Sequence, residues 1–250
     1  MSDMSMLING LKVTAEKGAT FERRNPLDGS VATRAPAASP ADAVMAVEAA
    51  AEAFKTWSET GPSERRALLL KAADALEAKL PKFVEAVAAE TGATGMWAGF
   101  NTMLAASMIR EAASLTTQVA GEVIPSDVPG SLAMGVRQPA GVVLGIAPWN
   151  APIILAVRAI CVPLACGNTV ILKGSENCPR THQLIIEAFQ DAGFPPGVVN
   201  YITNAPADAG AVVEAMVAHP AVRRVNFTGS TKVGKIIAMT CAKYLKPVVL

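Results

Sequence analysis

Polar side chains that could do chemistry follow three apolar stretches in the second half of the chain. They lie in Ala147-Pro148-Trp149-Asn150, in Lys173-Gly174-Ser175-Glu176 and in Gly229-Ser230-Thr231-Lys232-Val233-Gly234. Asn150 carries an amide donor that a rigid Pro-Trp dipeptide places, so it is a candidate for stabilising an oxyanion. The alternative role is the N-cap of a helix, and one side chain could serve both.

The other two loops carry groups suited to a nucleotide. Lys173 and Glu176 lie three residues apart, and a cation beside a carboxylate could bond the hydroxyls of a ribose; a solvated ion pair of little energetic worth is the alternative. Gly229 and Gly234 bracket a turn into a helix, where free amides and the helix dipole can hold a pyrophosphate and Ser230 adds a hydroxyl donor. The spacing matches neither of the common phosphate-loop patterns, so a purely structural helix entry stays open.

The apolar stretches themselves predict the sheet that positions these loops. They cover residues 142–146, 169–172, 198–202, 225–228 and 248–250, and continuous apolar runs are typical of strands buried on both faces. Helices are predicted between them, with Pro152 and Pro179 near two starts and Gly193 at one end. The fold class is therefore α/β, a doubly wound parallel sheet, whose ligands bind beyond the carboxyl ends of the strands.

The first 120 residues predict a short strand-like lead and then four helices. A turn at 25–29 separates two extended runs, and Ser39-Pro40-Ala41-Asp42 is a strong helix start. Further helices are expected from about Ser63 to Pro81, from there to Thr91-Gly92, and over 96–117. Residues 121–140 mix apolar residues with prolines and glycines, which favours a bent hairpin. We expect it to protrude as a subunit contact, with an ordinary surface hairpin as the alternative. The chain thus divides into 1–120, 121–140 and 141–250.

Composition excludes several classes of function. The 250 residues, 51% hydrophobic and 17% charged, can bury a sizeable core, yet no segment reaches the roughly 18 apolar residues of a membrane span. A net charge of +1 gives no attraction to nucleic acid or anionic membranes. The first ten residues lack the pattern of an export signal, so we expect a cytoplasmic protein. Four cysteines without a C-x-x-C pair and two separated histidines predict no metal site.

Taken together, four blocks resemble the successive signatures of the aldehyde dehydrogenase superfamily, in the same order and spacing. They are 147–150, 172–176, 193–200 and 227–234. The resemblance covers essentially the whole chain. In its details the sequence is similar to bacterial dehydrogenases that act on benzaldehyde, vanillin and salicylaldehyde, and the salicylaldehyde enzymes are the nearest of these by resemblance. It corresponds to the N-terminal, cofactor-binding half of such an enzyme.

The resemblance implies roles for individual residues. Asn150 would donate to the oxyanion of a thiohemiacetal, Lys173 and Glu176 would bind the adenosine ribose, and Ser230 would hold the pyrophosphate. A carboxylate at Glu176 repels a 2′-phosphate, so the cofactor would be NAD and not NADP. The implied cofactor-binding set is Ile146, Ala147, Pro148, Trp149, Lys173, Ser175, Glu176, Gly210, Phe227, Thr228, Gly229, Ser230, Val233 and Gly234.

The substrate would be a small-molecule aldehyde, and the enzyme a homodimer or homotetramer. Arg158 follows Asn150 by a little over two helical turns, so the two share a face with Ile154. Trp97 and Leu104, seven residues apart, would line the other wall of the aldehyde tunnel. An arginine facing an apolar tunnel needs a partner, and the ortho phenol oxygen of an aromatic aldehyde could provide it. A carboxylate elsewhere in the protein is the alternative partner.

The sequence also departs from the family pattern. Gly174 stands where a proline is usual, and Ala205 where many relatives carry a glycine. In the family, the general-base glutamate and the catalytic cysteine follow the strand that ends here at Leu250, so neither is in this sequence and the 250 residues alone are expected to be inactive. None of the four cysteines is expected to be nucleophilic. Two alternatives remain. The protein could be a non-catalytic nucleotide-binding or subunit-interaction protein of the same fold, or it could belong to an enzyme whose substrate is an aliphatic semialdehyde.

Overall fold

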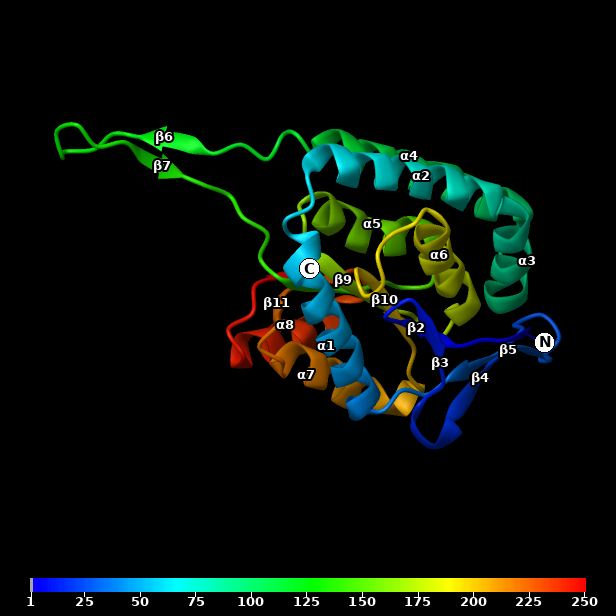
Figure 1. Cartoon of the computed structure of the whole chain (residues 1–250). Coiled ribbons are helices and arrows are strands. Elements are labelled where there is room, and N and C mark those ends of the chain that lie inside the picture. Colours follow the sequence, from blue (N-terminus) through cyan, green and yellow to red (C-terminus); the bar gives the residue numbers. More distant parts are fainter. Residues whose placement is uncertain (1) are drawn as a thin grey trace.

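A computed structural model describes residues 2–250 and has a seven-stranded sheet at its centre (Figure 1). The strand order is β12-β11-β8-β9-β10-β2-β3. The five parallel strands are β8 (Val142–Ile146), β9 (Thr169–Lys173), β10 (Val199–Ile202), β11 (Val222–Phe227) and β12 (Val248–Val249). The predicted parallel α/β sheet is therefore confirmed.

The N-terminal lead extends this sheet. β2 (Met6–Ile8) pairs antiparallel with β10, and β3 (Leu11–Val13) pairs antiparallel with β2. A separate small sheet has the order β1-β5-β4, formed by β1 (Ser2–Asp3), β4 (Thr20–Arg24) and β5 (Val31–Pro36). The sheet is thus mixed at one edge, where a purely parallel sheet was expected.

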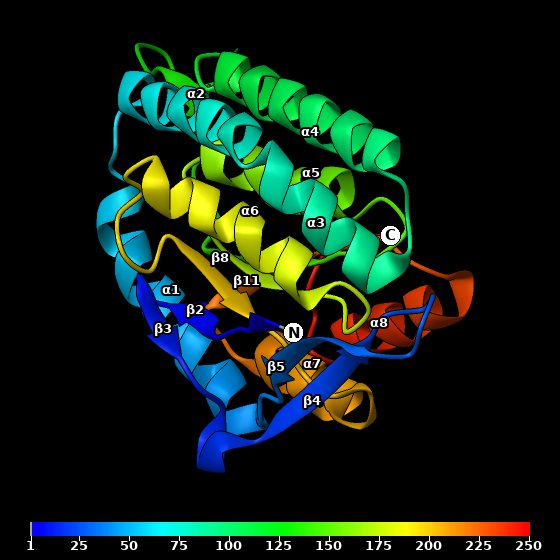
Figure 2. The same cartoon turned by 90° about the vertical axis from the view of Figure 1, so that its right-hand side faces the viewer.

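Helices cover both faces of the central sheet in layers (Figure 2). On one face lie α5 (Pro152–Ala165) and α6 (Pro179–Asp191), with α2 (Pro62–Ala78), α3 (Leu80–Thr91) and α4 (Gly95–Leu115) outside them. On the other face lie α1 (Pro40–Trp57), α7 (Ala209–Ala218) and α8 (Thr231–Lys243). Short 3₁₀ turns occur at η1 (Glu16–Gly18) and η2 (Pro206–Asp208).

The strands bury side chains on both faces, as continuous apolar runs require. Val143 and Leu172 belong to the core beneath α5 and α6, whereas Leu144 and Ile171 belong to the core beneath α1 and α7. Successive side chains of a strand point to opposite faces, so each strand contributes to both cores. This double burial fixes the register of the strands, and with it the positions of the loops that follow them.

Local signals set the helix boundaries. At the start of α1 the Ser39 hydroxyl accepts from the amide of Asp42 at 3.2 Å, and the Asp42 carboxylate accepts from the amide of Ser39 at 2.8 Å. This reciprocal capping box satisfies two helix-end donors. At the end of α3 Gly92 adopts a φ of 72°, the left-handed conformation that glycine tolerates.

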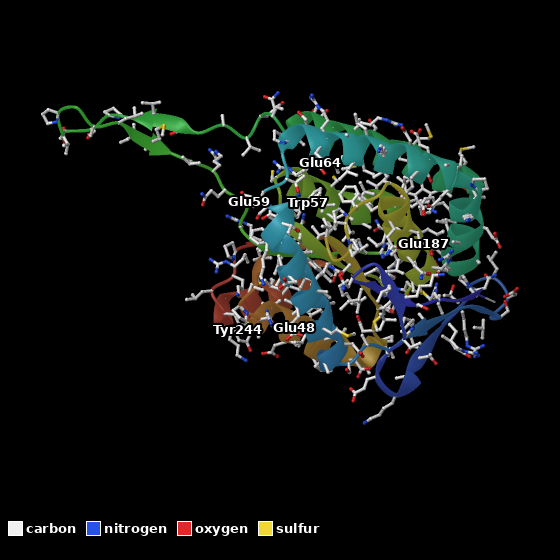
Figure 3. The ribbon with its side chains drawn as sticks, viewed as in Figure 1. Glu48, Trp57, Glu59, Glu64, Glu187 and Tyr244 are labelled. Atoms are coloured by element: carbon white, nitrogen blue, oxygen red, sulfur yellow. The ribbon has the colours of Figure 1, made fainter. Side chains whose placement is uncertain are left out.

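The hairpin predicted at 121–140 is present and protrudes. β6 (Glu122–Ile124) pairs antiparallel with β7 (Ala133–Gly135) on a ribbon that extends away from the helices and sheet (Figure 1). Its side chains project from it, and no other segment of residues 2–250 lies beside them (Figure 3). Within residues 2–250, no helix is long and apolar enough to cross a membrane.

Candidate nucleotide and aldehyde site

The carboxyl ends of four neighbouring strands meet at one edge of the sheet. Ile146 of β8 pairs with Lys173 of β9 and with Phe227 of β11. Lys173 pairs in turn with Ile202 of β10. The amide of Thr228 donates to the carbonyl oxygen of Ile146 at 3.1 Å, which ties the loop after β11 to the loop after β8. The three polar loops identified in the sequence therefore open at the same edge.

Asn150 lies in the loop between β8 and α5 and is exposed. The N-cap of α5 is Ala151, which makes no side-chain cap, so the capping role considered for Asn150 is not what the structure shows. The indole N–H of Trp97, on α4, donates to the backbone oxygen of Asn150 at 3.0 Å. This contact fixes the main chain at Asn150. The residue is exposed to solvent at the edge formed by the carboxyl ends of the parallel strands.

Lys173 and Glu176 form a largely buried pair. The Lys173 side chain is 8% exposed and its Nζ lies 3.6 Å from Oε2 of Glu176, whose side chain is 33% exposed. Burial lowers the pKa of Lys173, and the charge of Glu176 acts in the opposite direction. The solvated ion pair considered above is thus ruled out for Lys173. A buried ammonium with three donors beside a half-buried carboxylate is suited to a ligand that has vicinal hydroxyls.

The loop after β11 combines a helix start with a close backbone contact. Ser230 is the N-cap of α8, and its hydroxyl accepts from the amide of Val233 at 3.3 Å. A Cβ at Gly229 would lie 2.4 Å from the ring of Phe227, so only glycine lets the chain pass over this ring. Gly234 is buried and Val233 is 42% exposed. The loop is therefore a capped helix start, the kind of feature whose free amides and dipole attract anions.

The residues expected at the aldehyde lie around α4 and α5. Trp97 and Leu104, on α4, are each 39% exposed, and Ile154 is partly buried against the core. Arg158 is exposed on α5, and its Nη2 donates to the hydroxyl of Thr228 at 3.1 Å. The structure thus brings Trp97 to Asn150 and Arg158 to the loop after β11.

The remaining predicted residues are distributed along the same edge. Pro148 is half-buried and Trp149 is 49% exposed, beside the buried Ala147. Ser175 is buried and its hydroxyl accepts from the amide of Asn177 at 3.2 Å. Gly210 is exposed in the first turn of α7, after β10, with open space around it.

Two buried residues that the motifs did not reveal make hydrogen bonds to the backbone next to these loops. His182, on α6, accepts from the amide of Ser175 through Nδ1 at 3.1 Å, and its Nε2 lies 3.1 Å from the carbonyl oxygen of Pro152. The Glu90 carboxylate, on α3, accepts from the amides of Arg180 and Thr181 at 2.7 and 2.9 Å. Burial raises the pKa of Glu90, and its hydrogen bonds act against that rise. Glu90 thereby caps α6, whose own N-cap residue makes no side-chain cap.

The four cysteines lie in surroundings that disfavour the thiolate. Cys161, Cys178 and Cys241 are buried and Cys166 is half-buried, and all four are unpaired. Burial raises the pKa of every one of these thiols, to about 12 for Cys161. Within the described part of the chain, no group of three or more His, Cys, Asp or Glu side chains could hold a metal ion.

Gly174, which stands where the family has a proline, is explained by its neighbours. A Cβ there would lie 2.5 Å from the hydroxyl oxygen of Tyr201 and 2.7 Å from its ring. The Gly174 amide donates to the carbonyl oxygen of Ile202 at 3.0 Å, a bond that proline cannot make. The Tyr201 hydroxyl donates to the Pro179 carbonyl at 2.7 Å, so the ring is anchored in this space.

We expect Gly174→Ala to lower the free energy of unfolding by about 1–3 kcal/mol, because the added methyl overpacks a buried contact. Urea denaturation measures the change. Gly99→Ala is the matched control, since Gly99 lies inside α4 with open space around it, and it should stabilise slightly. A Gly174→Ala protein as stable as the parent would show that Tyr201 moves aside at no cost.

The fold and the aligned strand ends define a member of the aldehyde dehydrogenase family, and the sequence model of that family matches residues 13–250. The chain belongs to this family, which confirms the resemblance. A vanillin dehydrogenase of Pseudomonas fluorescens is 60% identical over 250 residues, which cover 100% of this chain and 52% of that protein. A salicylaldehyde dehydrogenase of Pseudomonas putida is 50% identical over 241 residues, which cover 96% of this chain and 50% of that protein.

Solved structures agree with the sequence relatives. The crystal structure of a salicylaldehyde dehydrogenase from Pseudomonas putida G7, complexed with salicylaldehyde, matches with a TM-score of 0.98 and 48% identity, over 100% of this chain and 52% of that chain. A NAD-dependent benzaldehyde dehydrogenase from Corynebacterium glutamicum matches with a TM-score of 0.93 and 33% identity, over 99% and 54%. The chain spans about half the length of the relatives it matches.

Proposed function

We propose that this chain supplies the cofactor-binding half of an enzyme that oxidises an aromatic aldehyde to the carboxylic acid with NAD, for example salicylaldehyde to salicylate. The observation that carries the proposal is the meeting of three loops at one sheet edge, bearing Asn150, the Lys173–Glu176 pair and the Ser230 cap of α8. Relatives named for vanillin, salicylaldehyde and benzaldehyde support the aromatic substrate.

The chain's own groups fit a dinucleotide. The start of α8 offers amides and a positive dipole end to a pyrophosphate, and the exposed faces of Trp149 and Val233 provide apolar walls. Lys173 can donate to ribose hydroxyls while Glu176 accepts from them. When bound, NAD supplies the hydride acceptor.

Asn150 would act on the aldehyde. Its amide would donate to the carbonyl oxygen as negative charge develops there, with the main chain held by Trp97. The raised thiol pKa values make the four cysteines present unsuitable as the nucleophile. The proposal therefore assigns the oxyanion donor and the cofactor loops to these 250 residues, and the nucleophile and general base to the other half of the enzyme.

The cofactor assignment predicts a charge effect at Glu176. The enzyme should bind NAD more tightly than NADP, and Glu176→Gln should narrow that difference about tenfold by removing the repulsion of a 2′-phosphate. Calorimetry with both dinucleotides measures it. Equal affinities for NAD and NADP in the parent would contradict the NAD assignment.

The substrate assignment predicts a selective effect at Arg158. Arg158→Leu should raise KM for 2-hydroxybenzaldehyde about tenfold and KM for benzaldehyde much less, because a buried phenol oxygen loses a charged donor. Steady-state kinetics with the two aldehydes measure the split. Equal shifts would mean that Arg158 acts only through Thr228, its partner in this structure.

The hairpin is proposed as the contact of a homodimer or homotetramer. Val123 and Leu132 are 74% and 70% exposed, and a two-stranded ribbon is only marginally stable by itself. The proposal keeps residues 121–140 as a separate element between 1–120 and 141–250, and the pairing of β2 with β10 joins those two parts in one body.

We also propose a cytoplasmic location for the protein. The four unpaired cysteines support it, because thiols stay reduced in that compartment.

A further inference from the structure

His182 is a fully buried histidine between two of the functional loops. It lies in the first turns of α6, and both of its ring nitrogens contact backbone groups of other segments. Nδ1 accepts from the amide of Ser175, between Lys173 and Glu176, at 3.1 Å. Nε2 lies 3.1 Å from the carbonyl oxygen of Pro152, two residues after Asn150. One side chain thus joins the loop after β9 to the loop after β8.

The two partners fix the tautomer of the ring. A backbone amide only donates and a backbone carbonyl only accepts, so Nδ1 carries no proton and Nε2 carries one. Burial, with a smaller contribution from the charge of Lys173, lowers the pKa of His182 to about 3. The imidazole is therefore neutral near pH 7, and each of its nitrogens makes a defined hydrogen bond.

The surroundings of the ring belong to the same loop system. The Cys178 sulfur lies 3.5 Å from Nε2 and 3.9 Å from Nδ1, and the pKa of this thiol is raised by burial. The Tyr201 hydroxyl donates to the carbonyl oxygen of Pro179, in the same first turns of α6 that carry His182. The His182 ring thus has a backbone partner at each nitrogen and the Cys178 sulfur beside it, which suits a group that holds two loops at a fixed separation.

We propose that His182 is a positioning residue. Through its bonds to Ser175 and Pro152, it fixes the position of the loop after β9, which carries Lys173 and Glu176, relative to the loop after β8, which carries Asn150. The inference rests on the proposed function, since it concerns how that site is held. The Ser175 bond keeps Lys173 and Glu176 in the geometry that binds NAD. The Pro152 bond keeps the start of α5, and with it Asn150, in the geometry that stabilises the oxyanion.

Two substitutions separate the bonds. His182→Asn places an amide oxygen near the position of Nδ1, so it keeps the acceptor for Ser175 and loses the donor to Pro152. His182→Gln places an amide nitrogen near the position of Nε2, so it keeps the donor to Pro152 and loses the acceptor for Ser175. The matched control is Gln183→Leu, because Gln183 is a buried polar residue of the same helix that donates to the backbone oxygen of Ser5.

The measurements are Kd for NAD by calorimetry and kcat for salicylaldehyde, on the full-length enzyme. We expect His182→Gln to raise Kd about tenfold with kcat nearly unchanged, and His182→Asn to lower kcat about tenfold with Kd nearly unchanged. Gln183→Leu should change neither. Equal values for all three variants and the parent, or equal losses in both histidine variants and the control, would overturn the inference and leave the proposed function standing.

A second measurement covers the case in which the variants do not fold. In the parent, the ring ¹⁵N shifts of His182 should report a neutral ring protonated at Nε2, as its bonds to Ser175 and Pro152 require. Shifts of a ring protonated at Nδ1, or at both nitrogens near pH 7, would overturn the inference. A parent enzyme that binds no NAD would overturn the proposed function itself, and the inference with it.

Discussion

Replacing Asn150 by alanine should lower kcat by about 10²–10³ while changing the affinity for NAD little. Removing one preorganised oxyanion donor has an effect of this size, because the hydrogen bond from the amide is stronger to the negatively charged oxygen of the transition state than to the carbonyl oxygen of the bound aldehyde. The main chain at this position is held independently by the indole of Trp97, so the loop should keep its course in the variant. Single-turnover kinetics under conditions where hydride transfer limits the rate measure the loss.

Asn150→Asp is the informative companion variant. It keeps the size of the side chain, removes both donors and adds a negative charge, so kcat should fall at least as far as in the alanine variant. NAD affinity by calorimetry is the internal control in both variants. A kcat close to the parent value would remove Asn150 from the chemistry, and since Ala151 occupies the cap position of α5, no capping role would remain for it.

Acid should destabilise the parent protein more than His182→Gln. Burial lowers the folded-state pKa of His182 to about 3, against about 6.5 in the unfolded chain. Between these values the unfolded state binds a proton that the native state does not, so this contribution to stability is complete above about pH 6.5 and is lost as the pH falls toward 3. Between pH 6 and pH 4 the loss amounts to about 2–3 kcal/mol.

Urea denaturation at several pH values measures this difference between parent and variant. Glutamine does not titrate, so the variant should have a lower free energy of unfolding at pH 7 and a flatter decline toward pH 4. Glu90, whose pKa is raised by burial, contributes in the opposite direction in both proteins and cancels in the comparison. Parallel pH profiles for the two proteins would show that the ring is protonated in the native state.

Local and periodic signals made much of the fold predictable. The Ser39–Asp42 capping box and the buried runs of β8 and β9 lie where the sequence placed them, because each depends on residues close together in the chain. The pairing of β2 with β10 could not be predicted. β2 has three residues, and its partner lies almost two hundred residues later, so neither length nor alternation identifies the edge it joins.

The candidate site shows the same division. Its three loops were predictable because the carboxyl ends of parallel strands share an edge, which turns separate motifs into one constellation. His182 and Glu90 were not, because their partners are mostly backbone groups that lie beside them only in the folded chain. Arg158 was expected to need a partner, and the Thr228 hydroxyl that it contacts is on a loop seventy residues away.

The Glu90 carboxylate has a consequence for how the molecule opens. It belongs to α3, yet it accepts from the first amides of α6, ninety residues later. A fluctuation that lifts α3 from α6 therefore leaves the start of α6 uncapped, and the loop carrying Lys173 to Glu176 directly precedes that start. We therefore expect α3, the start of α6 and the loop of residues 173–176 to lose order together, so that a disturbance begun at Glu90 reaches Lys173 and Glu176.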